Sequence, residues 1–240
     1  MLVFEKFELA PGVRLDARIA RGRVQVLTLD PEHVHEDFIA RYLAGGAARS
    51  AAGELWLEEV RDAEGKPTAL RRLKDEKLRG FFARFVGFVL RDGGLLDGLT
   101  VRENLLLSRR YHDVWPRGTV AGAEGMEELL RELAGDDVAG VAAAEVLERR
   151  PEELTVFARR YWGLMTTLLR RPQLLIAFAP FDGLRVADQE AIAGVLARYR
   201  RVEPTSAHLL VVTGAHETAA LAGVDVVELR PRMTAEEFST

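Results

Sequence analysis

The chain alternates short apolar runs, typical of strands, with longer runs of helical periodicity. Residues 4–29 contain short strand-like runs separated by Pro-Gly and Arg-Gly turns. Residues 53–72 alternate as a hairpin around Glu64-Gly65. Residues 38–45 form a short helical pattern, and residues 82–90 an apolar strand pattern. The first half therefore predicts a β-rich start followed by a strand–helix unit.

The second half predicts helices first and then alternating strands and helices. Thr100 precedes a helix-like run and has Glu103 three residues later, which is the pattern of a capping box. The expected elements are a mostly helical region at 122–171, a buried strand at 173–181, an amphipathic helix at 187–201, a buried strand at 208–214 and a last strand with a turn at 225–233. This order predicts an α/β sheet core with an inserted helical subdomain near residues 100–170.

Composition narrows the class of protein. The 240 residues suffice for one or two domains, and 48% apolar with 29% charged residues is a globular balance. A net charge of −4 argues against a nucleic-acid partner. The absence of cysteine excludes disulfides and thiol chemistry. Because the first residues do not match a signal peptide and no apolar run approaches about 20 residues, we expect a cytoplasmic globular protein.

Five segments in order resemble the nucleotide-binding domain of ABC transporters. They are "ARGRVQVLTL", "IARYLAGG", "GFVLRDGGLLDGLTVRENLLL", the stretch from "RRPEEL" to "APFDGL", and the stretch from "LLVVTG" to "DVVELR". The resemblance covers nearly the whole chain and implies a P-loop NTPase-like ABC ATPase fold in a single domain, 1–240. The α/β core would comprise residues 1–100 and 172–240, and the helical subdomain about 101–171.

The position of the family's phosphate loop, the Walker A motif G-x-x-x-x-G-K-[ST], falls on residues 30–37. There Asp30 and His35 stand at the glycines, Glu36 at the lysine and Asp37 at the Mg²⁺-binding Ser/Thr. Two unit charges about 4 Å apart interact by roughly 4 kcal/mol at an effective dielectric near 20, so replacing Lys by Glu changes the interaction with phosphate by about twice that amount. Glycine also permits close backbone approach to a ligand. We therefore expect no ordinary Mg-ATP binding at this loop.

The other chemical positions implied by the resemblance are also altered. They are Arg91 at the Q-loop glutamine, Phe178 at the Mg²⁺-linked Walker B aspartate, Ala179 at the catalytic glutamate, Arg185 at the D-loop aspartate and Gly214 at the switch histidine. Neither Phe178 nor Ala179 can accept a proton or orient water. His216, two residues beyond Gly214, offers at most a displaced substitute.

The signature motif L-S-G-G-Q reads "LTVFA" at residues 154–158. Thr155 keeps a hydroxyl that can cap the following helix. Val156 and Phe157 replace the two glycines and would block backbone approach to a phosphate. An aromatic side chain here favours contact with another protein, and we expect Phe157 to make one.

The acidic loop leaves three interpretations open. His33 and His35, with Glu36 and Asp37, have a spacing that permits a metal site. Alternatively, the acids pair with Arg91 or Arg185 and plug the former nucleotide pocket. The simplest interpretation is a solvated polar loop.

Segment 93–107 keeps the sequence pattern of the corresponding region in ABC transporters. One interpretation is that this segment docks a membrane subunit. The other is that its apolar residues are retained because they form part of the core; these are Leu95, Leu96, Leu99, Val101 and Leu105. The sequences "APF" and "MTAEEF" also resemble the ATPase subunit of MCE-type lipid transporters.

Together these features predict a pseudo-ATPase: a structural or regulatory subunit of a membrane transport complex, with lipids as the candidate cargo and with no cofactor. Since both halves of the family's shared ATP site are altered, neither a homodimer nor a heterodimer restores a complete site. The expected partners are a permease or other membrane subunit, an active ABC ATPase, or both, at the inner face of the membrane. The alternatives are a binding protein that reuses the site, for example for a metal at His33 and His35, or an ATP-binding protein with residual Mg-ATP binding.

Overall fold

The computed structural model describes residues 2–10, 13–29, 54–61, 65–69, 80, 85–114, 122–135, 144–212, 221, 224–230 and 232–233. The strands are β1 (Leu2–Ala10), β2 (Val13–Ile19), β3 (Val24–Thr28), β4 (Glu54–Arg61), β5 (Pro67–Ala69), β6 (Val86–Val89), β7 (Leu174–Phe178), β8 (Ala207–Val212), β9 (Val226–Leu229) and β10 (Arg232–Met233). The helices are α3 (Val101–Val114), α4 (Gly122–Ala134), α5 (Ala144–Leu147), the 3₁₀ turn η3 (Pro151–Glu153), α6 (Val156–Leu168) and α7 (Val186–Val202).

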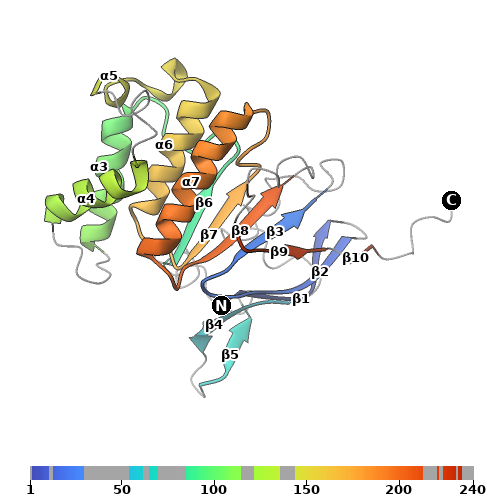
Figure 1. The fold of residues 1–240 in the computed structure, drawn as a ribbon. Coiled ribbons are helices and arrows are strands. Elements are labelled where there is room, and N and C mark those ends of the chain that lie inside the picture. The colour runs from blue at the N-terminus through green and yellow to red at the C-terminus, as the bar shows by residue number, and fades with distance from the viewer. Residues whose placement is uncertain are drawn as a thin grey trace.

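The strands form two five-stranded sheets. The central sheet has the order β6-β7-β8-β3-β9 and pairs in parallel throughout. The second sheet has the order β10-β2-β1-β4-β5 and pairs antiparallel. The helices gather on one side of the central sheet, and the antiparallel sheet lies on the other (Figure 1). The predicted β-rich start, the hairpin of β4 with β5 and the parallel core are confirmed.

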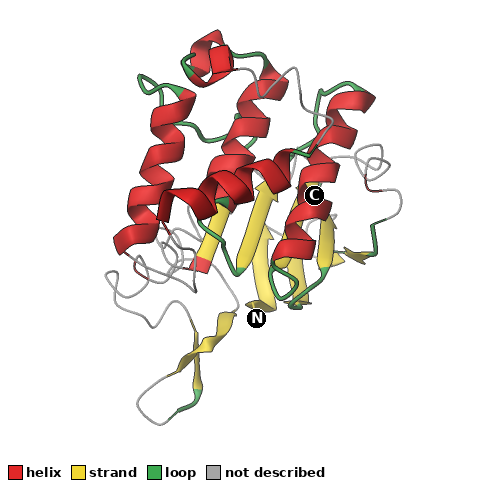
Figure 2. Cartoon of the chain, turned by 60° about the vertical axis from the view of Figure 1, so that its left-hand side comes forward, coloured by secondary structure: helices red, strands yellow, loops and turns green. Residues whose placement is uncertain are grey.

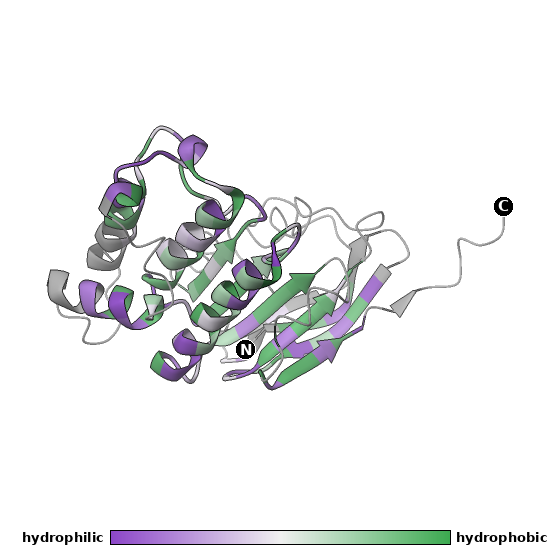
Figure 3. Ribbon diagram, turned by 45° about the horizontal axis from the view of Figure 1, so that its top comes forward, coloured by the Kyte–Doolittle hydropathy of each residue, from purple (hydrophilic) through white to green (hydrophobic). Residues whose placement is uncertain are grey.

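The inner strands β7 and β8 of the central sheet are buried because helices cover one face of the sheet and the second sheet lies against the other. Every residue of β7 and of β8 is buried, which explains why both are apolar except for His208. Figure 3 shows hydrophobic residues along these strands and mixed faces on the helices. Gln25 on β3 links the sheets, because its amide donates to the Arg18 carbonyl of β2 at 2.9 Å.

Helices α6 and α7 run along the central sheet (Figure 2). Helix α6 packs on β6, on α3 and on α7, and α4 packs on α7. Their shared core includes Trp162, Met165 and Leu168 of α6 and Leu196 and Tyr199 of α7. The core therefore fixes where α6 and α7 begin, next to the ends of β6 and β7.

Candidate functional site

The candidate site lies where β6 and β7 end. These strands are parallel neighbours, with Val89 paired to Ala177, so the turns that follow them emerge together. We call these two turns, residues 90–94 and 179–184, the carboxyl edge. In open parallel sheets ligands bind at this edge. The edge contains or adjoins Arg91, Phe178 and Ala179, which the sequence assigns to altered catalytic positions.

The end of β7 carries apolar side chains. Phe178 is 2% exposed and Ala179 is 5% exposed. The backbone of Ala179 has a φ of +42° and its N–H donates to the Val211 carbonyl of β8 at 2.7 Å. Neither side chain has a group that ligates Mg²⁺ or accepts a proton. The carboxylate that follows in the sequence, Asp182, lies in the turn beyond.

Arginines connect the two turns of the carboxyl edge. The Arg91 guanidinium forms an ion pair with the Asp182 carboxylate at 2.9 Å. Arg160 of α6, which is 6% exposed, donates from Nε to the Arg91 carbonyl at 2.5 Å and from a terminal nitrogen to the Asp182 carbonyl. Positive charge therefore lies between the turns, supplied by the chain itself.

The start of α6 confirms the predicted cap. The Thr155 hydroxyl accepts a hydrogen bond from the Ala158 N–H at 3.1 Å, and Val156 beside it is 59% exposed. Phe157 is half-buried against the core, and its ring lies 5.7 Å from that of Tyr161, one helical turn on; its expected contact with another protein stays a prediction. This pairing follows from i,i+4 spacing on a helix.

Tyr161 itself is fully buried. Burial raises the pKa of Tyr161 to about 12, against a smaller lowering by Arg198. Its hydroxyl is therefore neutral at ordinary pH and supplies no acid or base for chemistry.

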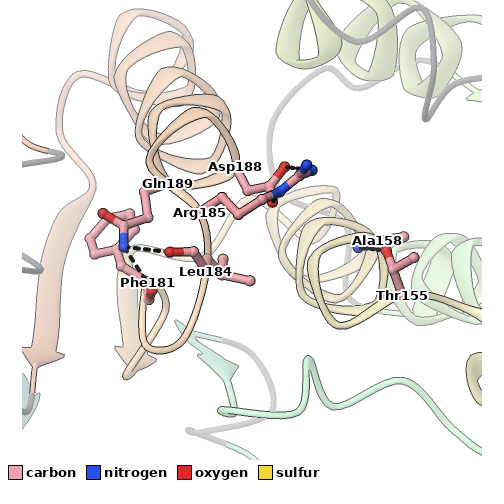
Figure 4. Close-up of polar contacts among 7 residues, drawn as sticks. All are labelled: Thr155, Ala158, Phe181, Leu184, Arg185, Asp188 and Gln189. Carbon is pink, nitrogen blue, oxygen red and sulfur yellow. Dashed lines mark hydrogen bonds and ion pairs between the residues drawn. The ribbon is translucent and has the colours of Figure 1, made fainter.

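At the start of α7, two polar residues act in opposite directions (Figure 4). Arg185 points outward and pairs with Asp188 at 2.9 Å, with its side chain 85% exposed. This hydrogen bond and the Asp188 charge raise the pKa of Arg185. Gln189 points inward and donates to the Phe181 carbonyl at 3.2 Å and the Leu184 carbonyl at 3.0 Å. The Gln189 contacts hold the turn after β7, whereas the ion pair joins an exposed Arg185 to an Asp188 side chain that is 13% exposed.

The loop before α3 is organised by buried and capping polar groups. The predicted capping box is confirmed: Thr100 N–H donates to Glu103 at 2.8 Å and Glu103 N–H to the Thr100 hydroxyl at 3.2 Å. Asn104, 3% exposed, accepts from Leu96 N–H at 2.8 Å and donates to the carbonyls of Leu96, Leu99 and Thr100. One side chain therefore fixes the path of this loop.

Leucines on this loop and α3 divide between core and surface. Val101 and Leu105 are buried, as the core interpretation requires. Leu96 is 56% exposed, Leu106 is 45% exposed and Leu107 is 39% exposed. Leu106 and Leu107 are neighbours on α3, and Asn104 of the same helix binds the backbone of Leu96, so the three exposed leucines belong to one loop–helix unit. We call Leu96, Leu106 and Leu107 the leucine patch.

Several predicted site residues lie outside the described residues. They are Asp30, His33, His35, Glu36, Asp37, Gly214 and His216. The phosphate-loop substitution, the metal site, the acidic plug and the switch position therefore stay predictions. Within the described ranges, no group of three or more His, Cys, Asp or Glu side chains could hold a metal. In the same ranges, no helix is long and apolar enough to cross a membrane.

Sequence reasoning missed four residues that shape the site: Arg160, Asp182, Gln189 and Asn104. Arg160 had a usable signal, because it stands four residues before Leu164 and eight before Leu168 on the buried stripe of α6. A charged residue on such a stripe indicates a specific buried partner.

The comparisons with known proteins agree with this architecture. No family model matches the chain. It is 30% identical over 150 residues to the ABC transporter ATP-binding protein YvcR of Bacillus subtilis, covering 62% of this chain and 52% of that protein. It is 33% identical over 130 residues to the phosphonates import ATP-binding protein PhnC of Bordetella parapertussis, covering 52% of this chain and 47% of that protein. The chain thus spans about half the length of the curated relatives it matches.

Solved structures align over more of the chain. The dimeric structure of MJ0796, a bacterial ABC transporter cassette, covers 96% of this chain and 94% of its own with a TM-score of 0.67 and 16% identity. The cbiO1 protein of Clostridium perfringens, part of the cbiONQ transporter complex, covers 96% of this chain and 86% of its own, with a TM-score of 0.64 and 14% identity. The fold is therefore that of an ABC ATPase cassette, as the sequence predicts.

Proposed function

We propose that this chain is a pseudo-ATPase: a catalytically inactive ABC-type subunit with a structural or regulatory role in a membrane transport complex. One observation carries the proposal. The strand that should end in the Mg²⁺-linked aspartate and the catalytic glutamate ends instead in Phe178 and Ala179, 2% and 5% exposed. A buried apolar pair at this place leaves no ligand for Mg²⁺ and no base for water.

The remaining altered positions support the same proposal. Arg91 at the glutamine position is engaged with Asp182, and Val156 and Phe157 at the signature glycines bring side chains to the start of α6. The sequence of residues 30–37 adds charge reversal at the phosphate loop. We propose that the chain is one domain, with core residues 1–100 and 172–240 and a helical subdomain near 101–171, and that it needs no cofactor.

The direct test is Mg-ATP binding to the purified full chain by calorimetry, with an intact ABC cassette titrated in parallel. We expect the intact cassette to bind and this chain to show no heat of binding at millimolar nucleotide. Micromolar affinity or measurable turnover by this chain would overturn the proposal in favour of an active ATP-binding protein.

The proposed partner is a membrane permease, alone or together with an active ABC ATPase, reached from the inner face of the membrane. The names of the relatives support transport, and the leucine patch supplies exposed apolar surface of the kind that marks protein contacts. A dimer with a second cassette is part of this proposal. The part of the proposal that names lipids as the cargo rests on the "APF" and "MTAEEF" resemblance.

A pull-down tests the docking surface. The chain is co-expressed with an ABC permease as the candidate membrane subunit, and captured subunit is quantified for the unmodified chain, for Leu96→Ser with Leu107→Ser, and for Val227→Ser. Val227 on β9 is 41% exposed, against 39% for Leu107, so it controls for loss of an exposed apolar side chain. We expect capture to fall at least about tenfold only in the leucine variant. Equal capture by all three proteins excludes the leucine patch as the docking surface.

A further inference from the structure

Arg160 draws together two turns that are far apart in the sequence. Its guanidinium binds the Arg91 carbonyl, 69 residues away, and the Asp182 carbonyl, 22 residues away. With only 6% of the residue exposed, this charge is removed from water and depends on its hydrogen bonds. If the two turns separate, a buried cation loses a partner, so Arg160 opposes their separation.

The side chains of the same two residues close a ring. Arg91 and Asp182, whose carbonyls bind Arg160, also join each other through the ion pair at 2.9 Å. Their side chains are 47% and 32% exposed, so water weakens this pair relative to a buried one. The buried Arg160 contacts are thus the stronger part of the ring and the ion pair is the weaker part.

The neighbouring contacts hold each turn from a second side. Gly163 lies on α6 three residues after Arg160, and a Cβ there would lie 1.8 Å from the Gly93 carbonyl oxygen. Gly93 itself has a φ of +95°. Helix α6 therefore rests on the backbone of the turn after β6. On the other side, Gln189 of α7 binds the Phe181 and Leu184 carbonyls of the turn after β7.

From this geometry we infer that Arg160, with the Arg91–Asp182 ion pair, is a built-in brace that holds the carboxyl edge in one conformation without any nucleotide. Arg160 is a positioning residue: it donates to a backbone carbonyl of each turn and so orients the two turns. The inference deepens the proposed function and rests on it. A subunit that does not bind ATP needs contacts of its own to hold this edge in one conformation. The brace would present a constant surface to the partner, independent of nucleotide concentration.

Amide hydrogen exchange on the full chain, in nucleotide-free buffer at constant pH, tests the brace. Peptides that cover residues 90–99 and 179–186 report the two turns, and peptides from β7 and β8 report global stability. We expect both turns to be protected in the unmodified chain. Arg160→Met should accelerate exchange in both turns by roughly tenfold or more, because it removes two hydrogen bonds to a charged group.

Arg159→Met is the matched control. Arg159 is the adjacent residue of the same helix, and its side chain donates to the Pro151 carbonyl at 3.0 Å, which belongs to neither turn. Its backbone lies against Gly93, and the variant leaves that backbone unchanged. It should leave exchange at the carboxyl edge within about twofold. Asp182→Asn removes only the partly exposed ion pair and should give a smaller acceleration in both turns. It also keeps the test decisive if Arg160→Met does not fold.

The outcomes separate the brace from the proposed function. Unprotected turns in the unmodified chain, or acceleration in only one turn in the variants, overturn the brace whatever the nucleotide titration gives. Protected turns together with measured Mg-ATP binding overturn the pseudo-ATPase proposal and leave the brace standing. Protected turns, no binding and coupled acceleration support both.

Discussion

The loop that leads into α3 and the end of β7 both belong to segments with an ABC resemblance, but they bury different kinds of side chain. Beside the loop, Asn104 of α3 is buried, and its side chain forms hydrogen bonds with three residues of the loop. Thr100 and Glu103 cap the helix reciprocally. At the end of β7, Phe178 and Ala179 are buried and apolar. Polar groups that shape the backbone are thus present in one region, while the polar groups that would hold a ligand are absent from the other.

The difference indicates which constraint acts on each region. A buried amide such as that of Asn104 is stable only if its donors and acceptors are satisfied, so it persists where the loop path itself matters. A carboxylate at the end of a buried strand is costly without a cation, so an apolar side chain is favoured when no cation binds. The following predictions are ordered from the largest expected effect to the smallest.

Phe178→Asp would return the carboxylate that the resemblance expects at the end of β7. We expect a loss of roughly 4 kcal/mol in the free energy of unfolding, because the variant removes a buried ring and buries a charge. Urea denaturation measures it, with Phe178→Leu as a control that loses about 1.5 kcal/mol or less. We expect no ATP turnover, since Ala179 still lacks a catalytic carboxylate. If Phe178→Asp were as stable as Phe178→Leu, the end of β7 would be hydrated and the contrast with the loop would fail.

Asn104→Ala tests the polar side of the comparison. The variant removes the side-chain partner of the Leu96 N–H and of the Leu99 carbonyl, so we expect a loss of about 3 kcal/mol in the free energy of unfolding. The Leu96 and Thr100 carbonyls keep the backbone N–H groups of Leu99 and Asn104 as donors. Glu103→Ala, which removes one exposed half of the capping box, should cost about 1 kcal/mol. Urea titrations of both variants measure the two losses in the free energy of unfolding. Equal losses would mean that Asn104 contributes no more than a surface cap.

His208 on β8 offers a contrasting buried polar residue. It is fully buried, and among the described residues neither ring nitrogen has a hydrogen-bond partner; its ring stacks on Tyr199 at 5.7 Å. Burial, with a smaller contribution from the Arg200 charge, lowers the pKa of His208 from 6.5 to about 3. The unfolded chain thus binds a proton more readily than the folded one, so stability is complete above about pH 6.5 and falls as the pH drops towards 3.

This linkage predicts a loss of about 1.4 kcal/mol per pH unit below 6.5, or about 2 kcal/mol at pH 5. The measurement is the difference in urea unfolding free energy between pH 7 and pH 5. His208→Leu should remove that part of the difference, while the other four histidines remain as an internal control. An unchanged pH dependence in the variant would show that His208 finds a partner when protonated.

Periodicity and local pairing explain what the sequence predicts well. The apolar runs of β7 and β8, the hairpin of β4 with β5 and the two helix caps at Thr100 and Thr155 all depend on residues within a few positions. Arg160 and Asp182 were missed because Arg160 joins residues that lie 69 and 22 positions away from it in the sequence. The packing of Phe157 on Tyr161 follows from their spacing on one helix, whereas its contact with another protein stays a prediction. Predicting which side chains meet at the edge of a sheet requires the order of its strands, and local sequence patterns do not contain that order.

Thr155→Ala should change the free energy of unfolding least. It tests whether Thr155 acts only as the N-cap of α6. The Thr155 hydroxyl accepts from the Ala158 N–H at 3.1 Å at an exposed position. Removing it should cost about 1 kcal/mol of unfolding free energy, the usual contribution of an N-cap, and Thr155→Ser should restore most of that. A loss well above 2 kcal/mol in thermal or urea unfolding would mean that Thr155 has partners beyond the cap. A loss of the expected size shows that Thr155 acts as an ordinary helix cap, next to the exposed Val156 and the half-buried Phe157.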